Sequence, residues 1–174
     1  MVVDAGEYDG DNKGKVYNLR KNVTITQGTL KIIGDKGEVR GEPPTTVAKL
    51  FGAPVCFRQK KDGSDEVMRG QGDRVEYDQG KERVEFFGKV VVHDGANEMR
   101  AEHVVYNMRT ETFEVRDKPN GQARVVLVPK EKDEPEAVAS DPAKEPQKPK
   151  LKTTKEIEAG RYEPLASKCI KEAL

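Results

Sequence analysis

The sequence contains no tryptophan, two histidines, two cysteines and few apolar residues of any kind. Hydrophobic residues make up 34% of the 174 positions, whereas charged residues make up 36%. The longest uninterrupted apolar run, Val125–Val128, is four residues long, whereas a membrane-spanning helix needs roughly 20. The composition therefore excludes a transmembrane helix and a thick helical core. It favours a thin-walled β structure or a chain with a disordered part.

The chain also lacks an excess of charge of either sign. Lys plus Arg total 31, and Asp plus Glu total 31. The balance holds within residues 1–128, with 21 of each sign, and within residues 129–174, with 10 of each. Non-specific binding to phosphate backbones needs a basic excess, so we expect no nucleic-acid partner.

The two cysteines, Cys56 and Cys169, are far apart in the sequence and have no metal-binding or redox spacing. We therefore expect no disulfide framework. Cys56 is expected to be a small buried residue and Cys169 to lie in a terminal tail. Polar residues follow Met1 closely, so no signal peptide is predicted. The chain is then either intracellular or a mature fragment that begins at an added Met.

Residues able to carry out catalysis are equally scarce. His93 and His103 do not form a His-x-His pair on one strand, and we interpret them as surface histidines. Ser64, Ser140 and Ser167 have no nucleophile elbow around them. We therefore predict no catalytic residue, no metal site and no cofactor, and we expect that the protein is not an enzyme.

The composition changes at Pro129. From there to Lys152 the chain is rich in proline, lysine and acidic residues, which bury too little apolar surface to offset the entropy of ordering. We predict a folded domain over residues 1–129 and a disordered tail over residues 130–174. The tail ends in a possible short helix, whose apolar residues follow Pro164 at helical spacing.

Residues 1–128 show short runs in which every second residue is apolar, separated by Gly, Asn and Asp turns. This alternation predicts strands with one apolar face and one mostly polar face. No part of this region keeps a helical period, so we predict an all-β fold of ten or more short strands. The alternating apolar pairs are Val23/Ile25, Leu30/Ile32, Val55/Phe57, Val75/Tyr77, Val84/Phe86, Val90/Val92, Val104/Tyr106, Phe113/Val115 and Val125/Leu127.

An internal repeat supports stacked strands. Lys21–Gly28 resembles Gly88–Gly95, and Asp4–Asp9 resembles Asp73–Asp78, with a weaker third copy beginning at Ala101. Stacked repeats of strands form walls with two exposed ends, where unpaired edges invite another chain. The apolar face either fills a closed interior or lines an open groove, and periodicity alone leaves both alternatives open.

Several motifs occur in the order found in a known family. The chain resembles the OstA-like family in Asn22–Ile32, Gly52–Gln59, Gly72–Asp78, Val84–Val92 and Val125–Pro129. The resemblance covers roughly residues 2–129. It implies a half-open β-jellyroll, also described as a β-taco, whose leading strand and signal peptide are missing or shortened here.

The resemblance also implies a function. Members of the family carry lipopolysaccharide through the periplasm, from the inner to the outer membrane of double-membraned bacteria, and have no enzymatic activity. The implied partners are lipopolysaccharide, bound through its lipid A acyl chains, inner- and outer-membrane transport components of the same fold, and further copies of the chain joined head to tail. The alternative is a structural interaction module with a closed dry core that binds partners only through its β edges.

On this interpretation the apolar face becomes the lipid-binding surface. The candidate lipid-binding residues are Val23, Ile25, Leu30, Ile32, Val55, Phe57, Val75, Tyr77, Val84, Phe86, Val90, Val92, Met99, Val104, Tyr106, Phe113 and Val115. The candidate partner edge is a strand over Gln122–Val128, in which Val125 and Leu127 face the interior.

Overall fold

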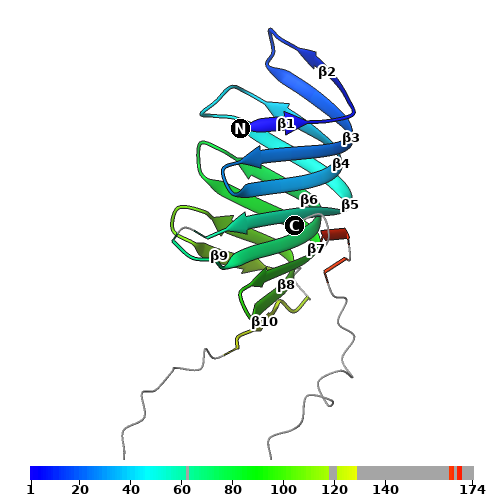
Figure 1. Ribbon diagram of the computed structural model, residues 1–174. Coiled ribbons are helices and arrows are strands. Elements are labelled where there is room, and N and C mark those ends of the chain that lie inside the picture. The colour runs from blue at the N-terminus through cyan, green and yellow to red at the C-terminus, as the bar shows by residue number, and fades with distance from the viewer. Residues whose placement is uncertain (62, 118–120, 129–164, 167, 170–174) are drawn as a thin grey trace, which may run out of the picture. The chain divides into compact units, whose positions relative to one another are not determined.

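A computed structural model describes residues 1–61, 63–117, 121–128, 165, 166, 168 and 169. These residues form a single antiparallel sheet of ten strands (Figure 1), which confirms the predicted all-β class. The strands are β1 (Val2–Asp4), β2 (Glu7–Asp11), β3 (Val16–Gln27), β4 (Leu30–Arg40), β5 (Val47–Lys60), β6 (Val67–Asp78), β7 (Arg83–Asp94), β8 (Asn97–Asn107), β9 (Thr112–Arg116) and β10 (Arg124–Val126).

The sheet is one open path rather than a closed barrel. Its strand order is β1-β3-β4-β5-β6-β7-β8-β10, with β2 also pairing with β3 and β9 also pairing with β8. The strands stack from β1 and β2 at one end to β9 and β10 at the other (Figure 1). Among the six long strands, β3 to β8, neighbours in sequence are also neighbours in the sheet, because hairpin turns connect them.

Each long strand, from β3 to β8, changes register near its middle and contributes to two walls. The first wall, called wall A, contains residues 16–20, 36–40, 47–51, 74–78, 83–87 and 103–107, with β2 and β9 at its edges. The second, wall B, contains residues 23–27, 30–33, 55–60, 67–71, 90–94 and 97–101, with β1 and β10 at its edges. The two walls therefore meet along the bends, and within the described residues no strand pairing joins their hairpin tips.

The bends explain the repeat seen in the sequence. Lys21 and Asn22 have φ angles of 62° and 52°, and the equivalent Gly88 and Lys89 have φ angles of 74° and 48°. A left-handed residue pair interrupts the pleat and redirects the strand from wall A to wall B. Both copies also end at a left-handed glycine, since Gly28 and Gly95 have φ angles of 57° and 60°. The repeat is therefore a bend, a strand segment of wall B and a turn.

Six strands are longer than the sequence predicts. Val84/Phe86 and Val90/Val92, for example, were expected on separate short strands, but both pairs lie on β7. The change of register between Phe87 and Val90 shows why the pattern suggests two strands. The side-chain alternation restarts at each bend, while the backbone continues.

The expectation that Cys56 and Cys169 remain unpaired is wrong, because they form a disulfide across a sequence separation of 113 residues. Cys56 points to the outer face of wall B, and Cys169 covers it with only 1% of its own surface exposed. Nearby, the amide of Ala166 donates to Gln71 Oε1 at 2.7 Å, and Lys168 Nζ lies 3.2 Å from Asp35 Oδ1.

The described residues of the C-terminal segment therefore contact the sheet. Leu165 is 7% exposed, and Lys168 and Cys169 are helical. By contacts, the chain divides into Met1–Val128 with Leu165–Leu174 as one unit and Pro129–Pro164 as the other. Residues 129–164 lie outside the described part, so the disordered tail predicted for them stays a prediction.

Candidate functional site

The predicted lipid-binding residues come together between the two walls. Fifteen of the seventeen belong to one cluster of buried side chains, none more than 6% exposed. The other two, Phe113 and Val115, pack against this cluster from β9 at the edge of wall A. The period-2 alternation therefore placed every candidate on the inner face. That these residues bind lipid stays a prediction.

The two walls touch through aromatic side chains. Phe57 on wall B and Phe86 on wall A meet edge to face, with ring centroids 5.1 Å apart and an interplanar angle of 83°. Gly70 on wall B leaves space for the same ring, because a Cβ there would lie 2.9 Å from Phe86 Cε1. Further along wall A, Tyr106 and Phe113 stack with ring centroids 4.7 Å apart. The first of these contacts joins the two inner faces, and the second extends the aromatic packing along wall A to its edge strand β9.

Some interior residues were missed in the sequence. They are Leu19, Val39, Ala48, Leu50 and Met68, all in the same buried cluster. Leu50 lies directly opposite Val75 in the sheet, on the face that the alternation predicts. The alternating pairs given above for this strand begin at Val55, so they do not include Val47–Phe51. In the structure this run lies within β5 as well.

The interior also contains a few polar atoms at the tips of wall A. The hydroxyl of Tyr77 is buried and has no hydrogen-bond partner among the described residues. Burial raises the pKa of this hydroxyl, and the nearby carboxylates of Glu82 and Asp78 raise it further. Thr46 is 1% exposed, and its Oγ1 likewise finds no partner in the described part of the chain. These groups offer hydrogen bonds to the polar part of a guest molecule.

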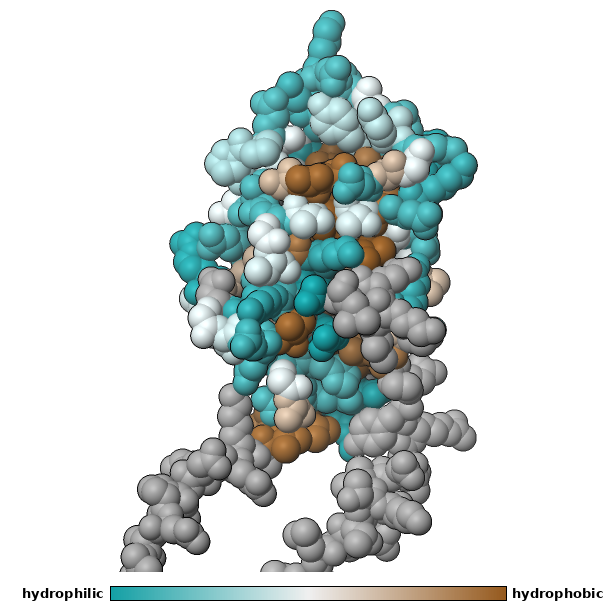
Figure 2. All heavy atoms as spheres, in the orientation of Figure 1, coloured by the Kyte–Doolittle hydropathy of each residue, from teal (hydrophilic) through white to brown (hydrophobic). Residues whose placement is uncertain are grey.

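The N-terminal end of the interior is open. A cavity of about 530 Å³ lies there, and apolar side chains reach the surface beneath the N-terminal strands (Figure 2). Its lining residues are Met1, Val3, Asp4, Ala5, Tyr8, Tyr17, Leu19, Val39, Gly41, Pro43 and Thr46. Leu19 and Val39 also belong to the buried cluster, so this cavity is continuous with the interior.

The C-terminal end is open as well. The strand β10 covers only Arg124–Val126, shorter than the predicted Gln122–Val128. Val125 lies opposite the buried Met99 and so faces the interior, yet it remains 48% exposed, because β10 is the last strand of the described sheet at this end. Leu127 lies beyond the strand and is 73% exposed. Apolar side chains are again visible near β10 in Figure 2.

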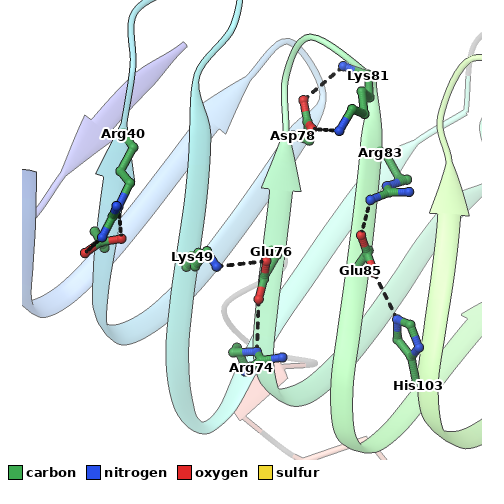
Figure 3. Close-up of polar contacts among 10 residues, drawn as sticks. Arg40, Lys49, Arg74, Glu76, Asp78, Lys81, Arg83, Glu85 and His103 are labelled. Atoms are coloured by element: carbon green, nitrogen blue, oxygen red, sulfur yellow. Dashed lines mark hydrogen bonds and ion pairs between the residues drawn. The ribbon is translucent and has the colours of Figure 1, made fainter. Parts of the chain in front are cut away.

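The outer face of wall A is a charge network rather than a site. Figure 3 shows ion pairs both between and within strands of this face. Lys49 on β5 lies 3.3 Å from Glu76 on β6, and Arg74, on the same strand as Glu76, lies 3.2 Å from it. His103 Nε2 lies 3.0 Å from Glu85 Oε2. These pairs are partly exposed to solvent, and ion pairs near the surface contribute little to stability. Positive and negative groups neutralise one another over this face.

The described residues contain neither a candidate metal site nor a candidate membrane-spanning helix. Within them, no three His, Cys, Asp or Glu side chains are grouped so that they could hold a metal ion. Among the same residues, no helix is long and apolar enough to cross a membrane. The expectation that the protein has no catalytic activity stays a prediction.

The fold and its interior define a class of protein, a half-open β-jellyroll whose two walls enclose an apolar interior that is open at both ends. The comparison with families is specific. Residues 2–112 match the family described as LptA/(LptD N-terminal domain) LPS transport protein, and the chain belongs to this family.

Individual relatives agree with this assignment. The lipopolysaccharide export system protein LptA of Escherichia coli K12 is 25% identical over 130 residues, which cover 73% of this chain and 70% of that protein. The LptA of Shigella flexneri matches to the same extent. The crystal structure of LptH from Pseudomonas aeruginosa, the LptA homologous periplasmic component of the lipopolysaccharide transport device, superimposes with a TM-score of 0.69. It is 22% identical, and the match covers 74% of this chain and 94% of LptH.

Proposed function

We propose that this protein binds the acyl chains of lipopolysaccharide between walls A and B and conducts them through the periplasm towards the outer membrane. The observation that carries the proposal is the continuous interior. Buried apolar side chains from every long strand form a single cluster that extends from one open end of the sheet to the other.

The energetics suit a carrier with many weak contacts. Exposing an acyl chain to water costs about 0.8 kcal/mol per CH₂ group, or on the order of 10 kcal/mol for a chain of about fourteen carbons. An interior of Val, Ile, Phe and Tyr removes most of this cost through non-directional contacts. Because no single contact is strong, the lipid can move along the interior without being trapped.

A lipid needs space that the packed interior does not offer, so the walls must separate. The open strand order supports such movement, because in the described sheet the hairpin tips of wall A do not pair with those of wall B. Separation would break the contact between Phe57 and Phe86, and an acyl chain would then cover both rings. The exchange replaces one apolar contact with another and costs little net free energy.

The compartment and the partners follow from the same proposal. A disulfide such as Cys56–Cys169 persists in oxidising compartments, the bacterial periplasm among them, and is rare in the cytosol. The partners would be transport components of the same fold at the inner and outer membranes, together with further copies of this chain. Paired strand edges at the open ends would continue both walls from one protein to the next.

The alternative function is a structural interaction module that binds partners only through its edges. One observation favours it, namely that fifteen of the candidate residues are at most 6% exposed. A dry, tightly packed core is what such a module would contain. The two functions differ in whether lipid enters between the walls.

Site-specific photo-crosslinking tests this difference. A photoreactive phenylalanine analogue placed at Phe57 or Tyr77, on the inner face, is expected to capture lipopolysaccharide when cells assemble their outer membrane. The same analogue at Thr24 or Val105, on the outer face, serves as the control and should capture little. Folded inner-face variants that capture no lipopolysaccharide would contradict the carrier function and support the closed module.

A further inference from the structure

The outer face of wall B carries a row of basic residues. Lys31 lies directly opposite Arg58, Arg58 opposite Arg69, and Arg69 opposite His93, on the consecutive strands β4, β5, β6 and β7. We call these four residues the basic ladder. Directly opposite side chains on one face have Cβ atoms about 4.5–5.5 Å apart. The register therefore places four basic side chains in one line across the sheet.

The centre of the ladder has no acidic neighbour on its own face. Arg58 and Arg69 face each other, and like charges directly opposite are destabilising. The adjacent outward-facing positions along β5 and β6 are Cys56, Lys60, Val67 and Gln71. None of these is acidic. The sheet therefore brings two guanidinium groups together without the negative charge that would stabilise the pair.

The hydrogen-bonding groups of the ladder are also incomplete. Within the described residues, the Nε atoms of Arg58 and Arg69 and the Nε2 atom of His93 are buried without a hydrogen-bond partner. The closest contact of His93 Nε2 to a carboxylate is 3.5 Å, to Glu98. Unpaired buried donors are costly, so acceptors are expected from outside this part of the chain.

The outer face of wall A differs from this ladder in its charge pattern, although the Nε atoms of Arg74 and Arg83 there are also buried without a hydrogen-bond partner among the described residues. There, basic residues alternate with acidic ones, as Lys49, Glu76 and Arg74 do (Figure 3). Arg83 pairs with Glu85 in the same way. On wall A the basic residues thus have acidic partners on the same face, whereas Arg58 and Arg69 at the centre of the ladder lie opposite only other members of the ladder.

We propose that the basic ladder binds the phosphate groups of the glycolipid whose acyl chains lie between the walls. This inference rests on the proposed function. The ladder lies next to the tips of wall B, where the open sheet would let a lipid head group emerge. Guanidinium groups match phosphate oxygens with two parallel hydrogen bonds, and neutralising phosphates would remove the repulsion between Arg58 and Arg69.

The inner side of the same rim provides polar groups for the linkage between head and acyl chains. Gln27 lies opposite Leu30, and Gln59 opposite Met68, so both side chains belong to the inner face. Their Oε1 atoms are buried and have no partner among the described residues. A lipid whose acyl chains are joined to its head by amides or carry hydroxyls would supply the missing donors. The acyl chains would then lie in the interior, the linkage would contact Gln27 and Gln59 at the rim, and the phosphates would contact the basic ladder.

Titrations with two probes test the ladder. The first probe is lipid A carrying two phosphates, and the second is its acyl-free bisphosphorylated disaccharide. The variant is Arg58→Gln/Arg69→Gln, and the matched control is Lys49→Gln/Arg83→Gln, which removes the same charge from the outer face of wall A. We expect the ladder variant to bind both probes about tenfold or more weakly, because it loses the charge-assisted hydrogen bonds of two guanidinium groups.

Stability measurements separate a binding role from a structural one. Removing two facing like charges should leave the melting temperature of the ladder variant unchanged or raise it, even though binding weakens. The control variant should bind both probes as the wild type does. Inorganic phosphate at the same concentration should compete weakly, because it spans only one position of the ladder.

The outcomes distinguish this inference from the function on which it rests. Unchanged binding of both probes by the ladder variant would overturn the ladder, while lipid capture at Phe57 would keep the carrier function. Loss of disaccharide binding in the ladder variant without any capture at Phe57 would support the ladder and contradict the carrier. Equal losses in the ladder variant and the control would show a general charge effect and overturn the ladder.

Discussion

At the scale of single residues, the contact between the walls depends on the absence of one side chain. Gly70 on wall B faces the ring of Phe86 on wall A, and the ring occupies the space that a Cβ would need. Phe57 holds the ring from the side, with centroids 5.1 Å apart. The position of the Phe86 ring is therefore determined by both walls. A substitution near the ring on wall B should alter the packing on wall A.

We predict that Gly70→Ala destabilises the fold by about 1–3 kcal/mol, the usual cost of overpacking a core. The added methyl would lie 2.9 Å from Phe86 Cε1, closer than a Cβ normally approaches another atom, so the ring or the strand would have to shift. Chemical denaturation measures the loss. The double variant Gly70→Ala/Phe86→Leu should recover part of it, because the smaller side chain clears the methyl. Equal losses in the single and the double variant would contradict this packing.

The inner residues were predictable because strand geometry alone determines which side they face. In a strand, alternate side chains point to opposite faces, so Val84 and Phe86 had to share a face once β7 was recognised. Arg58 and Arg69 were not predictable in the same way. Their proximity depends on the register between β5 and β6, which the sequence of neither strand contains.

At the scale of elements, the C-terminal segment and wall B are linked in a way that the sequence does not reveal. The outward-facing row next to the bends contains Ile33, Cys56, Gln71 and Val91 on four consecutive strands. Cys169 is bonded to Cys56 and the amide of Ala166 donates to Gln71 in this row, and Val91 is only 5% exposed although it points outward. The row forms only after four strands have paired, and proline-rich sequence separates it from residue 169. A prediction of an unpaired cysteine was therefore the natural one.

We predict that Cys169→Ser lowers the melting temperature by about 10 °C. A bond that closes a loop of this length typically contributes about 2–4 kcal/mol, mainly by restricting the unfolded chain. Differential scanning calorimetry measures the shift. A reductant should lower the melting temperature of the wild type and leave that of the variant unchanged, which separates the disulfide from other effects of the reagent.

The same bond changes the expectation for deletion of residues 130–174. The sequence suggests a dispensable tail, whereas the deletion would remove Cys169 together with the buried Leu165. Deletion should therefore cost at least as much stability as Cys169→Ser. A truncated protein with the melting temperature of the wild type would show that the segment adds nothing to the sheet.

At the scale of the whole described sheet, the two ends are complementary. Wall A ends in β2 on one side and β9 on the other, while wall B ends in β1 and β10. Joining the C-terminal end of one molecule to the N-terminal end of the next would pair the edges of both walls and continue the interior. Such a head-to-tail contact does not close on itself and can build a filament. Exposed Val125 and Leu127 would be covered at each junction.

We predict concentration-dependent oligomers of the wild type and their loss in Val125→Asp/Leu127→Asp. Two carboxylates in an apolar junction would lose their hydration without gaining a partner, which weakens association. Light scattering over a range of protein concentrations measures the effect. Ala96→Asp, in the exposed turn between β7 and β8, is the control and should associate as the wild type does. A wild type that stays monomeric at every concentration would contradict self-association and leave same-fold transport components as the only partners for these edges.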